Sequence, residues 1–128
     1  MDEKTFKERT KKFGLNVIRL VEALPKTRTA DVIGRQILRS ATSIGANYRA
    51  ACRAKSPVDM INKLKIVEEE GDETLYWLEL LGESSLVPQA HLLPLAKEGD
   101  ELIAITVASI KTLRAKTNHS SQSSTVNC

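Results

Sequence analysis

Two long stretches with helical periodicity, joined at Ser56-Pro57, constrain the fold of this chain more than any other feature. In the first stretch Ile33, Ile37 and Ile44 follow one another at spacings of four and seven, which puts them on one face of an α-helix. Ser56 has the side chain of a helix N-cap, and Pro57 suits the first helical position after it. The sequence therefore predicts two helices that meet at this dipeptide.

The first of these helices has a positively charged face opposite its apolar one. Five arginines share that face, namely Arg28, Arg35, Arg39, Arg49 and Arg53. Guanidinium groups bind phosphate oxygens in paired hydrogen bonds and displace counterions from nucleic acids. We therefore take these arginines as candidate contacts to RNA or DNA. The alternative is that they pair with carboxylates of a neighbouring subunit, and the protein is then an assembly scaffold without nucleic-acid binding.

A strip of small residues separates the apolar face from the arginines. It consists of Gly34, Ala41, Gly45 and Cys52. A glycine inside a helix costs about 1 kcal/mol relative to alanine, so two of them on one strip need a physical reason. Close approach of another helix backbone is such a reason, and we predict it here.

The second helix is apolar on two sides. Its main stripe consists of Ile61, Leu64, Val67, Leu75 and Leu78. A second apolar group lies on nearly the opposite side, and a helix with two apolar faces needs two partners, either inside its own fold or in another subunit. The predicted oligomer interface consists of Ile66, Trp77 and Leu80 with the acidic residues Glu69 and Glu73.

Two polar residues are predicted to lie in the core. Asn47 stands at the margin of the apolar face of the first helix, and Glu68 projects close to the middle of the main stripe of the second. An unpartnered carboxylate is costly to bury, so Glu68 needs a partner, for which Asn47, Ser40, Tyr48 or an arginine of the preceding helix are the candidates. We interpret Glu68 as a structural residue that fixes helix register rather than as a catalytic acid.

The flanking segments complete a bundle. A helix is predicted from Glu3 to Ala23, and a loop at 82–89 leads to a last helix whose first turn is marked by Pro94. Four amphipathic helices with short connections are typical of an antiparallel up-down-up-down four-helix bundle, so the predicted class is all-α over residues 1–116. The polar residues 117–128 have no apolar period and are predicted to form a disordered tail.

Charge is divided unevenly along the chain. Residues 1–55 carry 13 Lys/Arg against 5 Asp/Glu, a net charge of +8, whereas residues 56–105 carry 3 against 11, a net charge of −8. Charges separated in this way can be neutralised by opposite charges inside the molecule, by those of another subunit, or by an external polyanion. The expected partners are therefore further copies of the chain and RNA or DNA.

The residue inventory offers no catalytic or metal site. The only histidines are His91, in the loop region, and His119, in the tail. This excludes a His-based triad or a helix with two metal-binding histidines. The acidic run Glu68–Glu73 lacks the Glu-x-x-His pairs that a di-iron bundle needs. We therefore expect no enzyme, no cofactor, no metal and no small-molecule substrate. No apolar run is long enough to span a membrane and no secretory signal is recognisable, which predicts a cytoplasmic location.

Three short motifs resemble those of a known protein family. They are Ser-Ile-Gly-Ala-Asn at Ser43 to Asn47, Lys-Ser at Lys55-Ser56, and Glu-Thr-Leu-Tyr-Trp-Leu-Glu-Leu-Leu at Glu73 to Leu81. The family comprises four-helix bundle proteins encoded in intervening sequences of bacterial 23S ribosomal RNA genes. The resemblance covers nearly the whole chain apart from the tail.

This resemblance implies a small cytosolic protein of unknown cellular role that assembles as a ring-like homopentamer, in a family to which no enzymatic activity is ascribed. The family is similar, more distantly, to accessory proteins of diversity-generating retroelements. Those proteins are basic pentameric barrels that bind nucleic acid and a reverse transcriptase. The resemblance therefore implies that the expected oligomer is a homopentamer. It also agrees with the hypothesis of nucleic-acid binding.

Overall fold

Four helices account for nearly all of the chain. The computed structural model describes the backbone of residues 1–127 and the side chains of residues 1–118. The helices are α1 (Glu3–Glu22), α2 (Arg28–Cys52), α3 (Pro57–Glu83) and α4 (Gln89–Asn127). The described backbone contains no strand, and the helix packing is that of a four-helix bundle. The predicted all-α class is confirmed.

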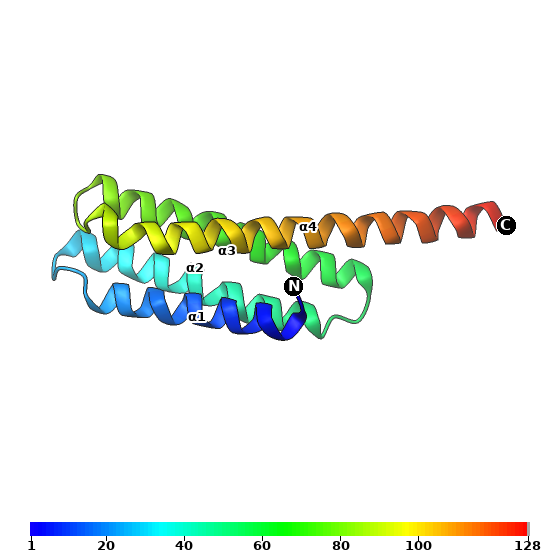
Figure 1. Ribbon diagram of the computed structural model, residues 1–128, viewed down its shortest axis with the longest axis horizontal. Helices are drawn as coiled ribbons and strands as arrows, with labels where there is room; N and C mark the ends of the chain where they lie inside the picture. Colours follow the sequence, from blue (N-terminus) through cyan, green and yellow to red (C-terminus); the bar gives the residue numbers. More distant parts are fainter. Residues whose placement is uncertain (128) are drawn as a thin grey trace.

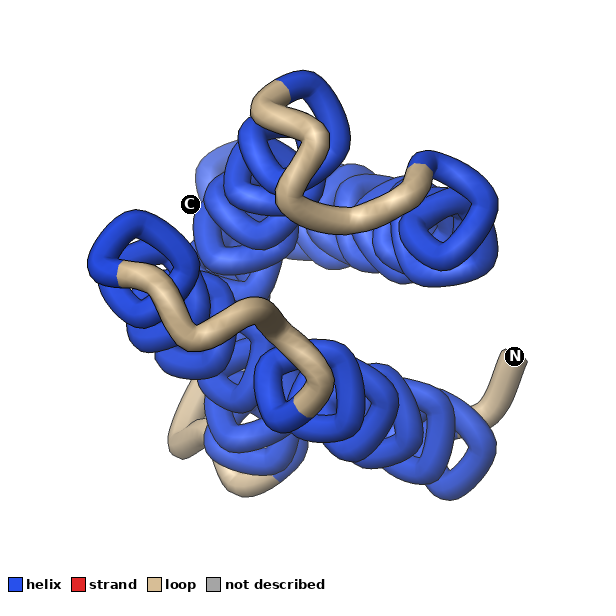
Figure 2. The backbone as a smooth tube through the Cα atoms, turned by 90° about the vertical axis from the view of Figure 1, so that its left-hand side faces the viewer, coloured by secondary structure: helices blue, strands red, loops and turns tan. Residues whose placement is uncertain are grey.

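Short connections make each helix antiparallel to the one before it. In Figure 1 α1 and α2 run through the lower half of the molecule and α3 and α4 through the upper half. The packing of α2 on α3 is the most extensive and that of α1 on α4 the least, and Figure 2 shows the four helices end-on. Three helix pairs of the bundle therefore pack extensively, and the fourth contact, between α1 and α4, is small. We call this small contact the α1–α4 seam.

The first three helices begin with side-chain caps. Asp2, Thr27 and Ser56 each accept a hydrogen bond from the backbone N–H three residues further on, which satisfies one of the free donors of a helix start. The predicted cap at Ser56 is thus present. Asp59 strengthens the same turn, because its carboxylate accepts from the Lys55 N–H at 3.2 Å.

The core is mainly aliphatic and contains one buried polar pair. Its largest fully buried side chains include Phe13, Ile37, Ile44, Leu64, Leu81 and Leu102. Between α2 and α3 the Thr74 hydroxyl donates to the Ser40 hydroxyl at 2.8 Å, and both residues are fully buried. Ser40 also reaches the Ile37 carbonyl at 3.2 Å, so the pair is hydrogen-bonded as buried polar groups require.

Asn47 and Glu68, predicted as the polar residues of the core, are both only half-buried. The Asn47 amide donates to the Ser43 carbonyl of its own helix at 2.9 Å, and no hydrogen bond or ion pair of Glu68 occurs within the described side chains. The buried column of α3 includes Thr74 and Leu81 beside the predicted stripe, so Glu68 lies at the edge of this column. Thr74, and not Glu68, is the partner of Ser40.

Helix α4 begins earlier than its proline suggests. It starts at Gln89, and Pro94 lies inside it. Leu92 is 3% exposed, so burial of this first turn offsets the one backbone hydrogen bond that the proline removes. No helix of the described chain is both long and apolar enough to cross a membrane.

At its other end α4 continues to Asn127, well past the ends of the other helices (Figure 1). It thus runs into residues 117–128, for which the sequence predicts a disordered tail. The side chains of residues 119–128 and the backbone of Cys128 lie outside the described part of the chain, and the disorder of this segment stays a prediction.

The strip of small residues on α2 is where α1 comes close, as predicted. A Cβ added at Gly45 would lie 3.6 Å from the backbone carbonyl carbon of Thr10. From the other side, a Cβ added at Gly14 would lie 3.9 Å from the Ala41 carbonyl oxygen. The two backbones therefore approach each other over small residues, and larger residues there would push the helices apart.

Replacing Gly14 and Gly71 by alanine should change the free energy of unfolding in opposite directions. A Cβ at Gly14 meets nothing closer than 3.9 Å, whereas one at Gly71 would lie 2.7 Å from Cγ1 of Ile103. We expect Gly14→Ala to raise the free energy of unfolding by about 0.5–1 kcal/mol through helix propensity. Gly71→Ala should lower it by about 1 kcal/mol, because Ile103 must move. Urea unfolding followed by circular dichroism measures both, and equal shifts of the same sign would contradict the described packing of α3 on α4.

Candidate nucleic-acid interface

The five arginines predicted to contact nucleic acid all lie exposed on α2 or at its end. Arg35 lies 3.2 Å from Asp31 in a pair whose side chains are 79% and 62% exposed, an arrangement that contributes little to stability. Arg28, Arg39, Arg49 and Arg53 have no carboxylate within 4.0 Å among the described residues. Four guanidinium groups are therefore available to an external anion.

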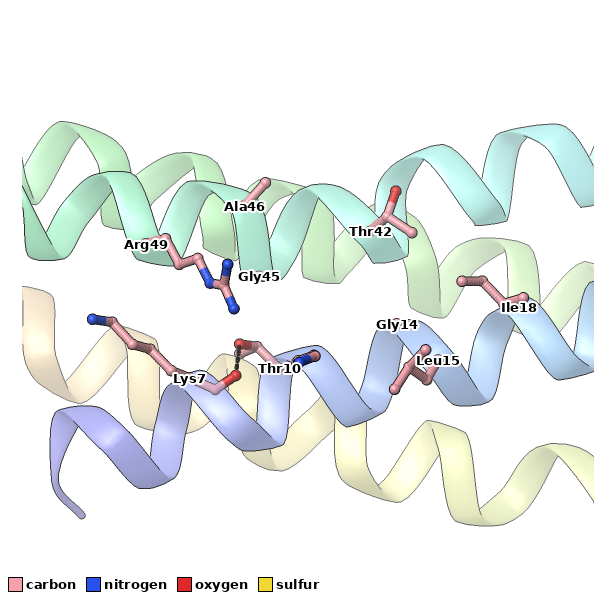
Figure 3. Close-up of a pocket in the computed structure, with 10 residues that line it drawn as sticks. Lys7, Thr10, Gly14, Leu15, Ile18, Thr42, Gly45, Ala46 and Arg49 are labelled. Carbon is pink, nitrogen blue, oxygen red and sulfur yellow. Dashed lines mark hydrogen bonds between the residues drawn. The ribbon is translucent and has the colours of Figure 1, made fainter.

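A groove between α1 and α2 brings further cations beside this face. It has a volume of about 320 Å³, and its lining is mostly apolar, with Lys7 and Arg49 at one end (Figure 3) and Lys11 also among the lining residues. Figure 3 shows Arg49 extending from α2 toward α1, where Lys7 lies, while Leu15 and Ile18 stand further along α1. The groove thus combines an apolar floor with a positively charged end.

A second, wider hollow lies where α2 passes into α3. Its cations are Arg49, Arg53, Lys55 and Lys63, with Asp59 as the acidic side chain among its lining residues. Because Arg49 lines both hollows, the positive surface continues from the α1–α2 groove round to the start of α3. The lysines of this surface were not predicted as part of the site, because they stand on different helices and the periodicity of one helix does not reveal them.

The predicted oligomer residues lie on the outer side of α3. Ile66, Glu73, Trp77 and Leu80 are half-buried and Glu69 is exposed. Trp77 and Leu80 also pack against the main core, so they serve the fold of the single chain as well. The indole N–H of Trp77 is buried without an acceptor among the described residues. Its neighbour Tyr76, absent from the predicted interface, is 53% exposed.

One acidic residue of α3 faces the arginine side. Burial raises the pKa of Glu70, the nearby Glu73 carboxylate raises it further, and Arg39 opposes them. A folded-state pKa above the unfolded value means that the ionised form of Glu70 weakens the fold, and that this penalty disappears as the pH falls through the folded pKa.

Glu70→Gln is therefore expected to be more stable than the natural chain at about pH 7, with the difference vanishing below about pH 4. Urea titrations at the two pH values measure it. Glu8→Gln, an exposed change on α1, is the control and should change little at either pH. A variant less stable than the natural chain at neutral pH would show that Glu70 has a cationic partner.

Two observations on the described residues concern catalytic chemistry. No group of three or more His, Cys, Asp and Glu side chains is placed to hold a metal ion among them. Burial raises the pKa of the half-buried Cys52 thiol, and a neighbouring hydrogen bond to Glu3 adds to the shift. A thiol with a raised pKa is a poor nucleophile at neutral pH.

A family model and a solved structure each match most of the chain. A family model described as "23S rRNA-intervening sequence protein" matches residues 3–108. The crystal structure of a protein of unknown function from the S23 ribosomal protein family of Bacteroides thetaiotaomicron is similar, with a TM-score of 0.81 and 35% sequence identity over 87% of this chain and 99% of that one. No curated protein matches the chain.

Proposed function

The chain belongs to the 23S rRNA-intervening sequence protein family, and from this premise we propose that it is a non-enzymatic, self-assembling protein that binds RNA or DNA through the arginine face of α2. One observation carries the proposal. Four of the five arginines on that face are exposed and have no carboxylate within 4.0 Å among the described residues. The predicted cytoplasmic location would give the face access to both nucleic acids, and the proposed assembly is the homopentamer that the family resemblance implies.

The dimensions of α2 suit a phosphate backbone. From Arg28 to Arg53 the helix rises about 38 Å at 1.5 Å per residue, close to the length of roughly 11 base pairs at 3.4 Å each. Arg35 and Arg39 stand one turn apart, as do Arg49 and Arg53. Paired guanidinium groups at such spacing can each reach a phosphate oxygen, and contacts of this kind fix position without reading sequence.

The second candidate is assembly alone. It is favoured by the charge division of the chain, in which α3 carries exposed acidic residues such as Glu69. If Glu69 and Glu73 of one subunit meet the arginines of another, the arginines hold the assembly together and no nucleic acid is bound. The two candidates differ in what removal of Arg35 and Arg39 does.

The test is the double variant Arg35→Gln/Arg39→Gln. Each lost phosphate contact lowers the slope of log affinity against log salt by about 0.9 on duplex DNA, so we expect the slope to fall by roughly 2. The matched control is Arg19→Gln/Arg114→Gln, which removes the same charge from exposed positions on α1 and α4. An equal change of slope in both variants would refute a site on α2. A changed mass with no bound nucleic acid would favour assembly alone.

A further inference from the structure

We infer that the groove between α1 and α2 receives an aromatic ridge from α3 of a second copy of the chain. The ridge consists of Tyr76, Trp77 and Leu80, and the groove is floored by Leu15, Ile18 and small residues. This inference rests on the proposed self-assembly and not on the proposed binding of nucleic acid. It names the two faces that meet.

The groove has the features of a docking surface. Leu15 and Ile18 are 43% and 38% exposed and line it together. Gly14, Gly45 and Ala46 form part of the lining (Figure 3), and small residues between two helices let a third element approach closely. Large apolar side chains that share an open groove are exposed to water in the single chain, and covering them is favourable.

The ridge lies on α3 and consists of an exposed aromatic side chain with two partly exposed neighbours. Tyr76 is 53% exposed, and its ring contacts that of Trp77 edge-on with centroids 5.3 Å apart. Leu80 stands one turn further along α3 and is half-buried. Aromatic residues that keep large exposed area at low conformational freedom are typical centres of protein interfaces.

Charge matches the two faces to each other. The groove is lined by three cations, Lys7, Lys11 and Arg49, whereas the ridge is flanked by Glu69 and Glu73 on the same side of α3. In the described residues neither glutamate, nor Lys11 or Arg49, takes part in an ion pair, and Lys7 has only an exposed contact to Glu3. An apolar floor with a cationic end therefore fits an apolar ridge with an acidic rim.

The ridge cannot fill the groove of its own chain. Helices α1 and α3 are a diagonal pair of the bundle without close backbone contact, and Tyr76 points to solvent on the outer side of α3. A ridge that fills the groove must therefore come from another copy, and each copy would give a ridge and receive one. Such a contact is head-to-tail, and it produces a ring when the rotation between copies closes.

Cross-linking tests this pairing directly. In a chain carrying Cys52→Ser and Cys128→Ser, we would place Leu15→Cys in one sample and Tyr76→Cys in another, and treat each with a short bismaleimide. We expect neither single variant to cross-link, their mixture after subunit exchange to give a covalent dimer, and the double variant to give a ladder of covalent oligomers. Leu93→Cys with Tyr76→Cys is the control, because Leu93 is 64% exposed on α4 and should give no ladder.

The sign of a charge introduced at Leu15 provides a second test of the pairing. Leu15→Glu and Leu15→Lys both replace an exposed apolar side chain by a charged one, yet only glutamate repels the acidic rim of the ridge. We expect Leu15→Glu to weaken self-association about tenfold more than Leu15→Lys, as measured by light scattering over a dilution series. Equal weakening by both would overturn the charge match.

The outcomes separate this inference from the function on which it rests. If the natural chain is an oligomer by light scattering but the double variant gives no ladder, or a single variant cross-links to itself, the groove and ridge do not pair and self-assembly stands. If the natural chain is a monomer at every concentration, self-assembly fails and the pairing fails with it. Binding of nucleic acid is measured in a separate titration. If the groove and the ridge pair, Arg49 belongs to the interface between copies, and Arg28, Arg35, Arg39 and Arg53 are left to contact the nucleic acid.

Discussion

Replacement of Phe13 by alanine is expected to lower the free energy of unfolding by about 3–5 kcal/mol, the usual cost of truncating a buried aromatic side chain. The ring is 1% exposed. It belongs to α1 but reaches α4, since a Cβ added at Gly99 would lie 3.5 Å from its Cζ atom. Phe13 therefore crosses the thinnest seam of the bundle, and a domain of total stability about 5–15 kcal/mol would lose a large share of it.

Urea unfolding followed by circular dichroism measures this loss. Leu93→Ala is the matched control, because Leu93 is 64% exposed on α4 and its truncation should change stability by less than about 0.5 kcal/mol. A loss at Phe13 no larger than at Leu93 would mean that α1 does not pack on α4 in the way described.

The second large effect is expected at Arg9, which joins α1 to α4 by charge. Its Nε donates to one oxygen of Glu98 at 2.9 Å, Nη2 donates to the other, and Nη2 also lies 3.3 Å from Glu101. The hydrogen bond to Glu98 raises the pKa of Arg9, so the guanidinium stays charged. Arg9→Met keeps much of the apolar stem and leaves Glu98 unpartnered, which should cost about 2 kcal/mol.

A double-mutant cycle assigns that cost to the pair. Glu98→Gln together with Arg9→Met should destabilise by clearly less than the sum of the single changes, because no unpaired charge remains. Arg35→Met is the control, since Arg35 pairs with Asp31 in an exposed position and should cost well under 1 kcal/mol. Strict additivity at Arg9 and Glu98 would show that the pair contributes nothing to the α1–α4 seam.

Much of the fold follows from the sequence because apolar periodicity and caps are local signals. The helix predicted from Glu3 to Ala23 is observed as Glu3–Glu22, and the break at Ser56-Pro57 separates α2 from α3. The strip around Gly45 correctly predicted a close helix neighbour. The start of α4 differs, because a proline near a helix start is compatible with several helical positions and tertiary burial of Leu92 selects among them.

The candidate site could be predicted only in part. The arginine face is a property of one helix and is visible in its spacing, whereas the groove joins Lys7 of α1 to Arg49 of α2 and depends on how the two helices are placed. Glu68 is half-buried and Thr74 is the buried partner of Ser40, because helical spacing alone does not decide which polar residue at the margin of an apolar stripe meets the neighbouring helix. The structural role of Glu68 stays a prediction. Tyr76 carries no periodic signal, since it lies opposite the buried column.

The most direct test of the proposed function is a binding titration of the purified protein against labelled structured RNA and duplex DNA at low and near-physiological salt, with its mass from light scattering on the same sample. We predict an oligomer whose binding is tight at low salt and falls steeply as salt rises, because counterion release drives phosphate contacts. An oligomer that binds neither nucleic acid at low salt, where electrostatic contacts are strongest, would contradict the proposal and leave assembly through α1, α2 and α3 as the function of these surfaces.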